Sequence, residues 1–510
     1  MEILGLVDVP LNIILALTAI VLIYIYGTWN FNYFNKQGIP GPAPYPFIGN
    51  SAGFGIFYDL PTLGQRYGRT FGIFTGRRPC FVISDLDILK EVLVKSFNNF
   101  RNRAFPMVIP YPFSLALAFL EDASWKRVRS ILSPTFSGGK LRRMCIPIND
   151  CARALANNFS KAIRKDEGVP MKQYFGAYTM DVISRTAFGI KVDSQNDFNH
   201  PFVVNAKQMF SPTKLRSFFA LLGVMIPVLA PFLQKLGMGF FPQTVIKFFH
   251  RSIREMIKQR QHDSKEQREQ RNDFLQHMID AEGQDQQEEK GGVANGGTTD
   301  NHSVKRLSAD EIVAQGILFF IAGYETTAST LQFVSYCLAT HPDIQKKAYN
   351  EIKEKLGDED PDYDNIGKLK YLDNVITETL RLYPAAVMLN RNVSETIKIR
   401  DITISVGQTV FTPVMAMQRD AQLYKDPDSF KPERHDEKSN PLSFLAFGYG
   451  PRACIGMRLA LVEAKIALVH VMRIVTFERA PDTPDVLTFK RNSQLLQPSK
   501  DIILKVSPRW

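Results

Sequence analysis

The sequence is poor in cysteine, with five among its 510 residues. Their odd number and irregular spacing give neither a disulfide framework nor the Cys-x-x-Cys spacing of a zinc site. A chain with free thiols and no disulfide framework is expected in a reducing compartment. The five are Cys80, Cys145, Cys151, Cys337 and Cys454.

The sequence also lacks internal repeats, a recognisable nucleic-acid-binding module and a convincing dinucleotide-binding motif. Its formal net charge of +11 is scattered along the chain. Such a charge suits nucleic acid, an anionic membrane surface or an acidic protein partner. Because no nucleic-acid module is visible, we favour the membrane and protein partners. We expect the protein to bind neither nucleic acid nor NADPH.

Charge is absent from residues 11–29, which are mostly aliphatic or aromatic. A run of this length is just long enough to cross a bilayer. The first basic residue after it is Lys36, so the positive-inside rule places the rest of the chain in the cytosol. A cleaved signal peptide is the alternative. The missing basic n-region and the bulky Tyr24, Tyr26 and Trp29 count against it.

The most specific pattern is Phe447-Gly-Tyr-Gly-Pro-Arg-Ala-Cys-Ile-Gly456. Its glycines let the backbone bend tightly and approach a flat ligand closely. Cys454 stands where this loop enters an apolar segment, 455–475, for which we predict a helix. The helix dipole and free N–H groups there favour a thiolate. Such a thiolate suits a single bond to a haem iron, and the planar fork of Arg452 is placed to meet a haem propionate.

This stretch resembles the haem-binding loop of the cytochrome P450 superfamily, Phe-x-x-Gly-x-Arg-x-Cys-x-Gly. Every fixed position is matched, by Phe447, Gly450, Arg452, Cys454 and Gly456. The alternative is a glycine-rich turn beside a buried free cysteine. The resemblance implies that the chain binds haem b (iron protoporphyrin IX), with Cys454 as the axial ligand of the iron.

A second motif lies within a long predicted helix. Ser308-Ala-Asp-Glu311 has capping-box spacing, and about thirty residues without proline follow. Their middle, 316–334, is apolar on nearly all sides, so the helix should run through the core. Within it Ala322-Gly-Tyr-Glu-Thr-Thr327 buries a carboxylate and two hydroxyls, which is costly without partners or a function. A helix kink held by threonine back-bonds is the alternative.

The Ala322–Thr327 stretch resembles the P450 oxygen-activation motif, which implies that Thr326 contacts dioxygen and Glu325 helps to deliver protons. Trp125 and Arg129 share one face of a predicted helix, and the family uses this pair to hold a haem propionate. An ordinary amphipathic helix is the alternative. The resemblance gives the same role to Arg391 and, more weakly, to Arg103.

Glu378-Thr-Leu-Arg381 places an acid and a base three residues apart on a predicted helix, 369–383. Most such pairs are minor surface salt bridges. With Arg434 they resemble the P450 triad that supports the haem loop structurally. His435 departs from the phenylalanine that the family more often has there.

The expected fold class is mainly α with small β-sheets (α+β). By resemblance it is the cytochrome P450 fold, with haem between a long central helix and the helix of the cysteine loop. An N-terminal transmembrane helix is added to it. The expected divisions are an anchor at 1–36, a proline-rich hinge at 37–50, and one haem-thiolate catalytic domain at 51–510 with a flexible loop at 282–306.

Local patterns add smaller expectations. Residues 71–84 predict a β-hairpin and 85–95 a short helix. The apolar stretch 211–249 predicts a surface patch that dips into lipid, because Pro227 and Pro231 argue against a second membrane-spanning helix. Its role in capping a substrate channel is implied by the resemblance.

The resemblance covers nearly the whole chain and is closest to the animal clan that includes the liver drug oxidases and thromboxane synthase. It implies a monooxygenase in the endoplasmic reticulum membrane, with its catalytic domain in the cytosol. Electrons would come from NADPH–cytochrome P450 reductase, with cytochrome b5 as a further candidate. Basic residues that could meet the reductase are Lys126, Arg127 and Arg458, although a generic solvated face is equally open.

Two other functions are alternatives to a monooxygenase. A haem-thiolate isomerase resembling thromboxane synthase would not need Thr326 and Thr327, which this chain keeps. A non-catalytic haem carrier would not need the pair of Glu325 and Thr326. The substrate is expected to be lipophilic (a steroid, fatty acid or xenobiotic), because the segments that should line the cavity by resemblance are apolar. These are 104–120, the stretch from Phe218, residues near Phe320, 385–389 and Leu495–Leu496.

Overall fold

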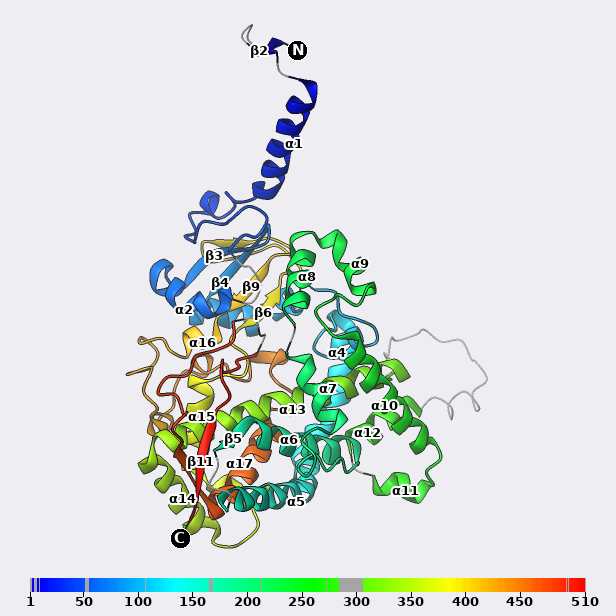
Figure 1. The fold of residues 1–510 in the computed structure, drawn as a ribbon, viewed down its shortest axis with the longest axis vertical. Helices are drawn as coiled ribbons and strands as arrows, with labels where there is room; N and C mark the ends of the chain where they lie inside the picture. The colour runs from blue at the N-terminus through cyan, green and yellow to red at the C-terminus, as the bar shows by residue number, and fades with distance from the viewer. Residues whose placement is uncertain are drawn as a thin grey trace.

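The computed structural model describes residues 2–3, 7–8, 10–50, 55–105, 107–164, 168–211, 213–271, 273–283, 306–491, 493 and 495–509. A long helix, α1 (Leu11–Thr28), projects from one end of a body made of helices and small sheets (Figure 1). The C-terminus lies at the opposite end of the body. The mainly helical α+β class is therefore confirmed.

The largest sheet lies at the end of the body next to α1 (Figure 1). Its strand order is β3-β4-β9-β6, with β4 and β9 parallel and the other pairs antiparallel. The β3–β4 pair confirms the predicted hairpin. A second sheet has the order β10-β11-β5, and β1–β2 and β7–β8 form separate pairs. The bounds are β1 Glu2–Ile3, β2 Val7–Asp8, β3 Thr70–Thr75, β4 Arg78–Ile83, β5 Val169–Pro170, β6 Leu389–Asn392, β7 Ile397–Ile399, β8 Ile402–Ile404, β9 Thr409–Thr412, β10 Val475–Arg479 and β11 Ile503–Pro508.

Helices form the rest of the body. Their bounds are α2 Ile56–Tyr67, α3 Leu86–Lys90, α4 Asp122–Leu132, α5 Gly138–Ile163, α6 Met171–Phe188, α7 Pro201–Met209, α8 Lys214–Met225, α9 Ala230–Lys235, α10 Gln243–Gln261, α11 Lys265–Gln270, α12 Phe274–Gly283, α13 Ala309–Thr340, α14 Pro342–Leu356, α15 Lys370–Leu382, α16 Val414–Met417 and α17 Met457–Ile474.

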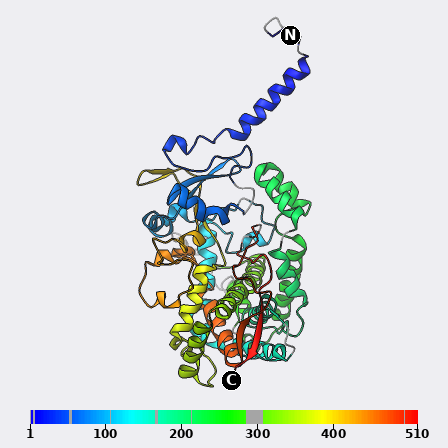
Figure 2. The ribbon, with the colours of Figure 1, turned by 60° about the vertical axis from the view of Figure 1, so that its left-hand side comes forward.

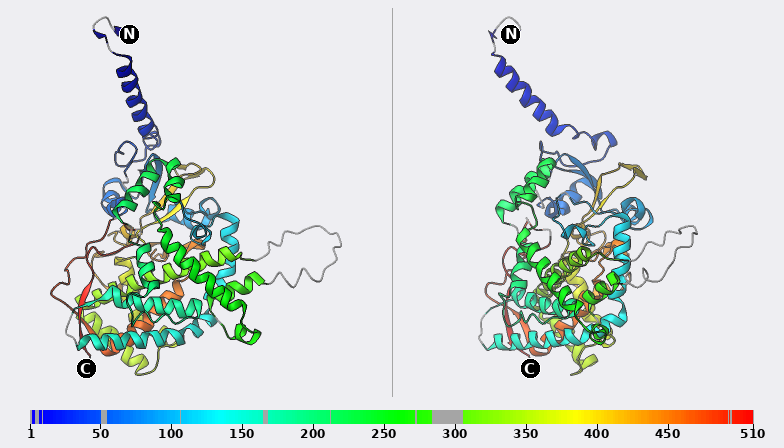
Figure 3. Two further views of the ribbon diagram at one scale, coloured as in Figure 1. Left: turned by 45° about the vertical axis from the view of Figure 1, so that its right-hand side comes forward. Right: turned by 90° about the vertical axis from the view of Figure 1, so that its right-hand side faces the viewer.

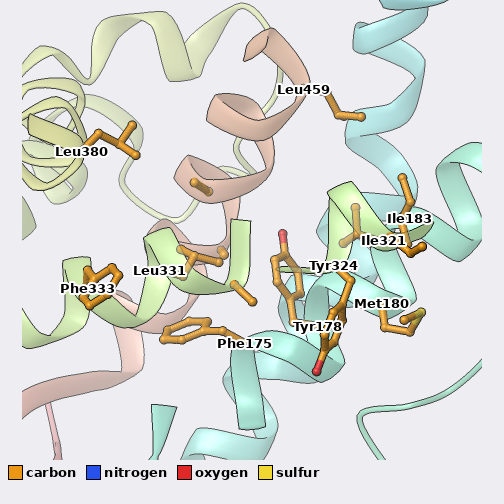
Figure 4. Close-up of a cluster of buried hydrophobic side chains, with 14 of the residues drawn as sticks. Phe175, Tyr178, Met180, Ile183, Ile321, Tyr324, Leu331, Phe333, Leu380 and Leu459 are labelled. Carbon is orange, nitrogen blue, oxygen red and sulfur yellow. The ribbon is translucent and has the colours of Figure 1, made fainter. Parts of the chain in front are cut away.

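Helix α13 runs through the middle of the body, as predicted. Its first turn is closed by the capping box: the Ser308 hydroxyl accepts from the Glu311 N–H, and the Glu311 carboxylate accepts from the Ser308 N–H. Nearly all later side chains of α13 are buried. Figure 4 shows Tyr324 of α13 beside Tyr178 of α6 in this core. The surrounding helices therefore pack against the apolar side chains of α13.

The end of α1 is packed against the body. Gly27 is buried, and a Cβ atom there would lie 2.6 Å from the Phe47 ring. Phe47 donates its N–H to the Gly27 carbonyl at 3.1 Å. Arg77 donates to the Tyr26 carbonyl at 2.9 Å, and its guanidinium lies 3.7 Å from the centre of the Tyr26 ring. We call Tyr26, Gly27, Phe47 and Arg77 the clasp.

The remainder of α1 makes few contacts. Among the described residues it is the one helix long and apolar enough to cross a membrane, and only 6% of its 18 residues are buried. A core helix of a soluble protein would be mostly buried, so that alternative is excluded for α1. Figure 2 shows the helix extending away from the body.

Helices α8 and α9 lie at the same end of the body as α1 in both views of Figure 3. A short 3-10 turn, Pro227–Leu229, separates them, so the apolar stretch 211–249 is not one membrane-spanning helix. Several large apolar side chains are exposed on the two helices and their flanks. We call these residues the apolar crest: Leu215, Phe218, Ile226, Val228, Phe232 and Leu236.

Two predicted helices differ in detail. The helix predicted at 85–95 is α3 followed by a π-helical turn, Glu91–Lys95. The prediction that a helix starts at 455 is wrong by two residues, since α17 begins at Met457. Of the loop predicted at 282–306, residues 284–305 lie outside the described part of the chain.

Glu463 of α17 supports a prediction about pH and stability. Its carboxyl is buried, Oε1 has no hydrogen-bond partner among the described residues, and burial raises its pKa well above the ordinary 4.5. Above pH 4.5 the unfolded chain releases this proton while the folded chain keeps it, so rising pH costs stability. We expect Glu463→Gln to stabilise the protein increasingly from pH 5 to pH 8, by up to about 1.4 kcal/mol per pH unit. Thermal unfolding of both proteins measures this, and an equal difference at both pH values would contradict it.

Candidate cofactor and active site

The cysteine loop is shaped by two glycines with left-handed backbone. Gly448 has φ +71° and Gly450 has φ +73°. A Cβ atom on Gly450 would lie 2.2 Å from the Leu93 carbonyl oxygen, so no larger residue fits. Gly456 differs, because its φ is −88° and a Cβ would meet Phe136 at an ordinary 3.8 Å. The described protein atoms therefore require glycine at 448 and 450, but not at 456.

Cys454 borders an internal space. Its side chain is accessible to solvent, yet the surrounding protein is dense enough for burial to raise the pKa of its thiol. Backbone hydrogen bonds from Gly456 and Met457, and the charges of Arg103 and Arg129, act in the opposite direction. These N–H groups belong to the residues at the start of α17, which explains why the helix begins after the cysteine. Burial is the larger effect on this pKa, and the N–H groups and arginine charges favour a negative charge on the sulfur against it.

Four arginines gather beside the cysteine. Burial lowers the pKa of Arg391 to about 9, with Arg103 contributing, and it lowers the pKa of Arg452 to about 9, with Arg103 and Arg391 contributing. Burial also lowers the pKa of Arg103 and Arg129, which the Cys454 thiolate charge opposes. The structure thus brings together residues from four separate segments of the chain.

These four arginines have no acidic partner among the described residues. None forms an ion pair with an acid among the described residues, and the buried Nε of Arg391 has no hydrogen-bond partner there. Arg391 and Arg452 are buried, and buried cations without acids are costly unless a ligand neutralises them. The cluster therefore fits a bound group with more than one negative charge.

Arg452 also holds the loop that precedes α4. Its guanidinium donates to the carbonyls of Arg101 at 2.9 Å and Leu120 at 2.8 Å. It lies 4.2 Å from the centre of the Trp125 ring. Trp125 and Arg129 project from the same face of α4 toward this cluster, as the sequence predicts.

The centre of α13 is open on one side. Ala322 is exposed and Thr326 partly exposed, although the helix around them is buried. The Thr326 hydroxyl donates to the Ala322 carbonyl at 2.9 Å, so the back-bond foreseen as the alternative is present. Gly323 instead serves close packing, because a Cβ there would lie 3.0 Å from Ile183 of α6. Helix α13 also contacts α17, the helix that follows the cysteine loop.

Glu325 is buried and turned toward α6. Its side chain is 3% exposed, and Lys172 lies 3.0 Å from its Oε1. The Gln497 amide donates to the same oxygen at 3.0 Å. Neither partner could be found from the sequence, because each lies more than 150 residues from Glu325 and belongs to no motif.

Glu378, Arg381 and Arg434 meet as predicted. Arg381 donates to both carboxylate oxygens of Glu378 at 2.8 and 2.9 Å, and Arg434 donates at 2.8 Å. His435 adds a further contact at 2.9 Å. Burial raises the pKa of Glu378, but the hydrogen bonds from Arg381 and His435 outweigh it and lower the pKa to about 2. The residue that departs from the family pattern thus joins the same cluster.

Comparison with known proteins identifies the family. The model of the family described as Cytochrome P450 matches residues 39–506. The chain belongs to the cytochrome P450 family. It is 40% identical to Cytochrome P450 3A29 of Sus scrofa over 97% of this chain and 96% of that protein. It is 38% identical to Cytochrome P450 3A5 of Homo sapiens over 97% and 96% of the two chains.

This cytochrome P450 is a haem-thiolate monooxygenase with haem b as its cofactor. The residues present fit that group. Haem carries two propionates, which match the unpaired arginine cluster, and its iron accepts a thiolate ligand. The cytochrome P450 fold predicted from the sequence is confirmed by the family.

The basic residues expected on the cysteine side of this P450 differ in availability. Arg127 is paired with the Glu311 carboxylate and with the Arg306 carbonyl. Arg127 is therefore engaged within the protein, and its contact with a reductase stays a prediction. Lys126 and Arg458 are exposed.

Proposed function

We propose that Cys454 is the axial ligand of the haem iron, and that Arg103, Arg129, Arg391 and Arg452 neutralise its propionates. The observation that supports this most strongly is a cluster of four arginines beside a thiol that accepts from backbone N–H groups. Arg391 and Arg452 are buried, and none of the four is paired with an acid among the described residues. Phe447, Gly450, Gly456 and Trp125 would shape and line the same site. Glycine at 456 then has a reason that the protein atoms do not supply, which is close approach to a flat ligand.

When bound, haem with a thiolate ligand supplies the chemistry that activates dioxygen and inserts one oxygen atom into a C–H bond. The protein supplies orientation and protons. The Thr326 hydroxyl proton is committed to the Ala322 carbonyl, so its oxygen lone pairs remain free to accept a hydrogen bond from the open side of α13. We assign Glu325 the role of passing protons to that side. Thr326 and Glu325 would both act from their positions on α13.

The proposed substrate is lipophilic and enters from the membrane side. The loop at 104–120 contributes Phe105, Phe113 and Phe119, which pack with one another and with Phe241 at centroid distances of 4.7 to 5.9 Å. Such a wall favours apolar ligands with few polar groups. The apolar crest lies at the same end of the body as α1, which suits entry from a bilayer.

For the whole protein we propose α1 as a single-pass anchor in the endoplasmic reticulum membrane, with the catalytic domain in the cytosol. Residues 1–36 would form the anchor, 37–50 the proline-rich hinge, and 51–510 one catalytic domain. NADPH–cytochrome P450 reductase would deliver electrons, with cytochrome b5 as a second candidate. Lys126 and Arg458 are the exposed cations that we assign to an acidic partner surface.

Thr326→Ala tests the proposed function. Proton delivery by a positioned group is worth about 10²–10⁴-fold, so we expect product formation to fall at least about tenfold. NADPH oxidation should continue and release hydrogen peroxide. The measurement is product, peroxide and NADPH in parallel, with reductase and testosterone as probe.

The matched control for this test is Thr330→Ala. Thr330 makes the same kind of back-bond one turn later, to the Thr326 carbonyl at 2.9 Å, and it is buried where Thr326 is partly exposed. Its substitution should leave the partition between product and peroxide unchanged. An isomerase would be indifferent to both substitutions, so unaltered product formation in Thr326→Ala would overturn the proposal.

A further inference from the structure

A short stretch of backbone, residues 115–120, joins the long central helix to the cysteine loop. It begins at the end of the 3-10 turn Phe113–Leu115 and lies just before α4. We call residues 115–120 the bridge segment. Among the described residues, the hydrogen bonds that tie it to distant parts of the chain come from Gln315 of α13 and from Arg452 of the cysteine loop. Its position therefore depends on both of these elements.

The side-chain amide of Gln315 is engaged at both of its ends. Its Oε1 accepts from the Leu117 N–H at 2.8 Å, and its Nε2 donates to the Leu115 carbonyl at 2.8 Å. The same Nε2 donates to the Glu311 carbonyl, one turn earlier in α13, at 3.2 Å. Gln315 is fully buried. Removing its amide would therefore leave one donor and one acceptor of the bridge segment without partners inside the protein.

The orientation of the Arg452 guanidinium is set by backbone carbonyls, two of which belong to the bridge segment. Nε donates to the Arg101 carbonyl at 2.9 Å, Nη1 to the Leu117 carbonyl at 3.4 Å and Nη2 to the Leu120 carbonyl at 2.8 Å. A guanidinium has five N–H donors. These three bonds leave two of them, one on each terminal nitrogen. Such a pair of donors suits the two oxygens of one carboxylate.

The backbone of Leu117 is the point at which the two sets of hydrogen bonds meet. Its N–H is bound by Gln315, and its carbonyl is bound by Arg452. A movement of Leu117 away from α13 would carry that carbonyl with it and turn the guanidinium. The long helix is thus connected, through one residue, with the direction in which Arg452 presents its two remaining donors.

We propose that Gln315 is a positioning residue for the haem propionates. It fixes the bridge segment so that Arg452 directs its two remaining N–H groups at one propionate. The proposal rests on the function proposed for Arg452. Gln315 acts through Leu117 and Arg452, so its loss weakens the hold on the cofactor.

The test measures haem retention by the full-length ferric protein. Gln315→Met keeps the length of the side chain but loses its hydrogen bonds. We expect haem to transfer to excess apomyoglobin about tenfold faster than from the wild type, because leaving buried backbone groups unpaired shifts a local equilibrium by about that factor. The reduction potential of the haem should fall as well, because a propionate that is less fully neutralised favours the ferric state.

The matched control is Gln332→Met. Gln332 is a second buried glutamine of α13, and its Oε1 has no hydrogen-bond partner among the described residues. Neither haem transfer nor the reduction potential should change in this variant. If Gln315→Met does not give folded protein, Gln315→Asn takes its place, since it keeps the amide but is one methylene too short to reach the bridge segment.

Arg452→Lys separates this proposal from the function on which it rests. Lysine keeps the charge but lacks the planar fork, so haem transfer should be faster, and Gln315→Met should add little in that background. Unchanged haem transfer in Arg452→Lys overturns the propionate role of Arg452. A full effect of Arg452→Lys with wild-type transfer in Gln315→Met overturns only the role of Gln315. Fully additive effects also overturn it, because they show that Gln315 acts independently of Arg452.

A second measurement follows the bridge segment directly. Hydrogen exchange of peptides that cover residues 113–120 should be faster in Gln315→Met than in the wild type, and unaltered in Gln332→Met. Equal exchange in all three proteins contradicts the hold of Gln315 on the bridge segment.

Discussion

Replacing Cys454 by serine is expected to lower monooxygenase turnover on the order of 10³-fold or more. A hydroxyl is not ionised at neutral pH and cannot push electron density onto iron as a thiolate does. The backbone N–H groups of Gly456 and Met457, placed to favour an anion at position 454, would face a neutral group. The measurement is the absorption spectrum of the dithionite-reduced protein with carbon monoxide, followed by turnover. The wild type should give a strongly red-shifted Soret band, and Cys454→Ser should not.

Cys145→Ser is the control for this experiment. Cys145 is a buried free thiol of α5 that lies outside the cysteine loop. A serine there keeps the hydrogen bond to the Leu141 carbonyl. We expect an unaltered red-shifted band from this variant. A red-shifted band that survives in Cys454→Ser would show that another thiol binds the iron.

Replacing Glu378 by glutamine is expected to destabilise the folded protein by about 3–5 kcal/mol. Glu378 and Arg381 are both fully buried, so the change leaves a guanidinium without its counter-ion. A folded protein is typically stable by about 5–15 kcal/mol, so much of the margin is lost. We expect a poor yield of folded haem protein at 37 °C and a much lower denaturant midpoint at pH 7.

The pH dependence of this effect follows from the lowered pKa of Glu378. The ionised acid is favoured in the folded state, so its contribution is complete above the ordinary value of 4.5 and is lost as pH falls toward about 2. The difference between wild type and Glu378→Gln should therefore shrink between pH 4.5 and pH 2. Glu433→Gln is the matched control. Its side chain is about half exposed and pairs with Lys347, so its loss should cost less than about 1 kcal/mol.

Local patterns were enough to predict several elements. The capping box that starts α13, the β3–β4 hairpin and the absence of a second membrane-spanning helix at 211–249 all depend on residues close together in the sequence. The four arginines of the cluster were also foreseen individually, since each belongs to a family motif. Their meeting without acidic partners among the described residues could not be foreseen, because it depends on how four distant segments pack.

Contacts between distant segments account for what the sequence missed. Lys172 and Gln497 reach Glu325 from opposite ends of the chain, and no periodicity connects them. Arg127 looks like a surface cation, but the fold places Glu311 beside it. His435 looked like a small departure from the family pattern until its contact with Glu378 was located. In each case the tertiary fold brings the two partners together.

The clasp has a consequence for the way the protein responds to its lipid surroundings. A transmembrane helix adjusts to bilayers of different thickness by changing its tilt. Because Gly27 lies against Phe47 and Arg77 holds Tyr26, α1 cannot lean without turning the catalytic body with it. A thicker or thinner bilayer would then raise or lower the apolar crest relative to the lipid surface. With α1 as the proposed anchor, membrane thickness would control how readily a lipid-dissolved compound reaches the apolar crest.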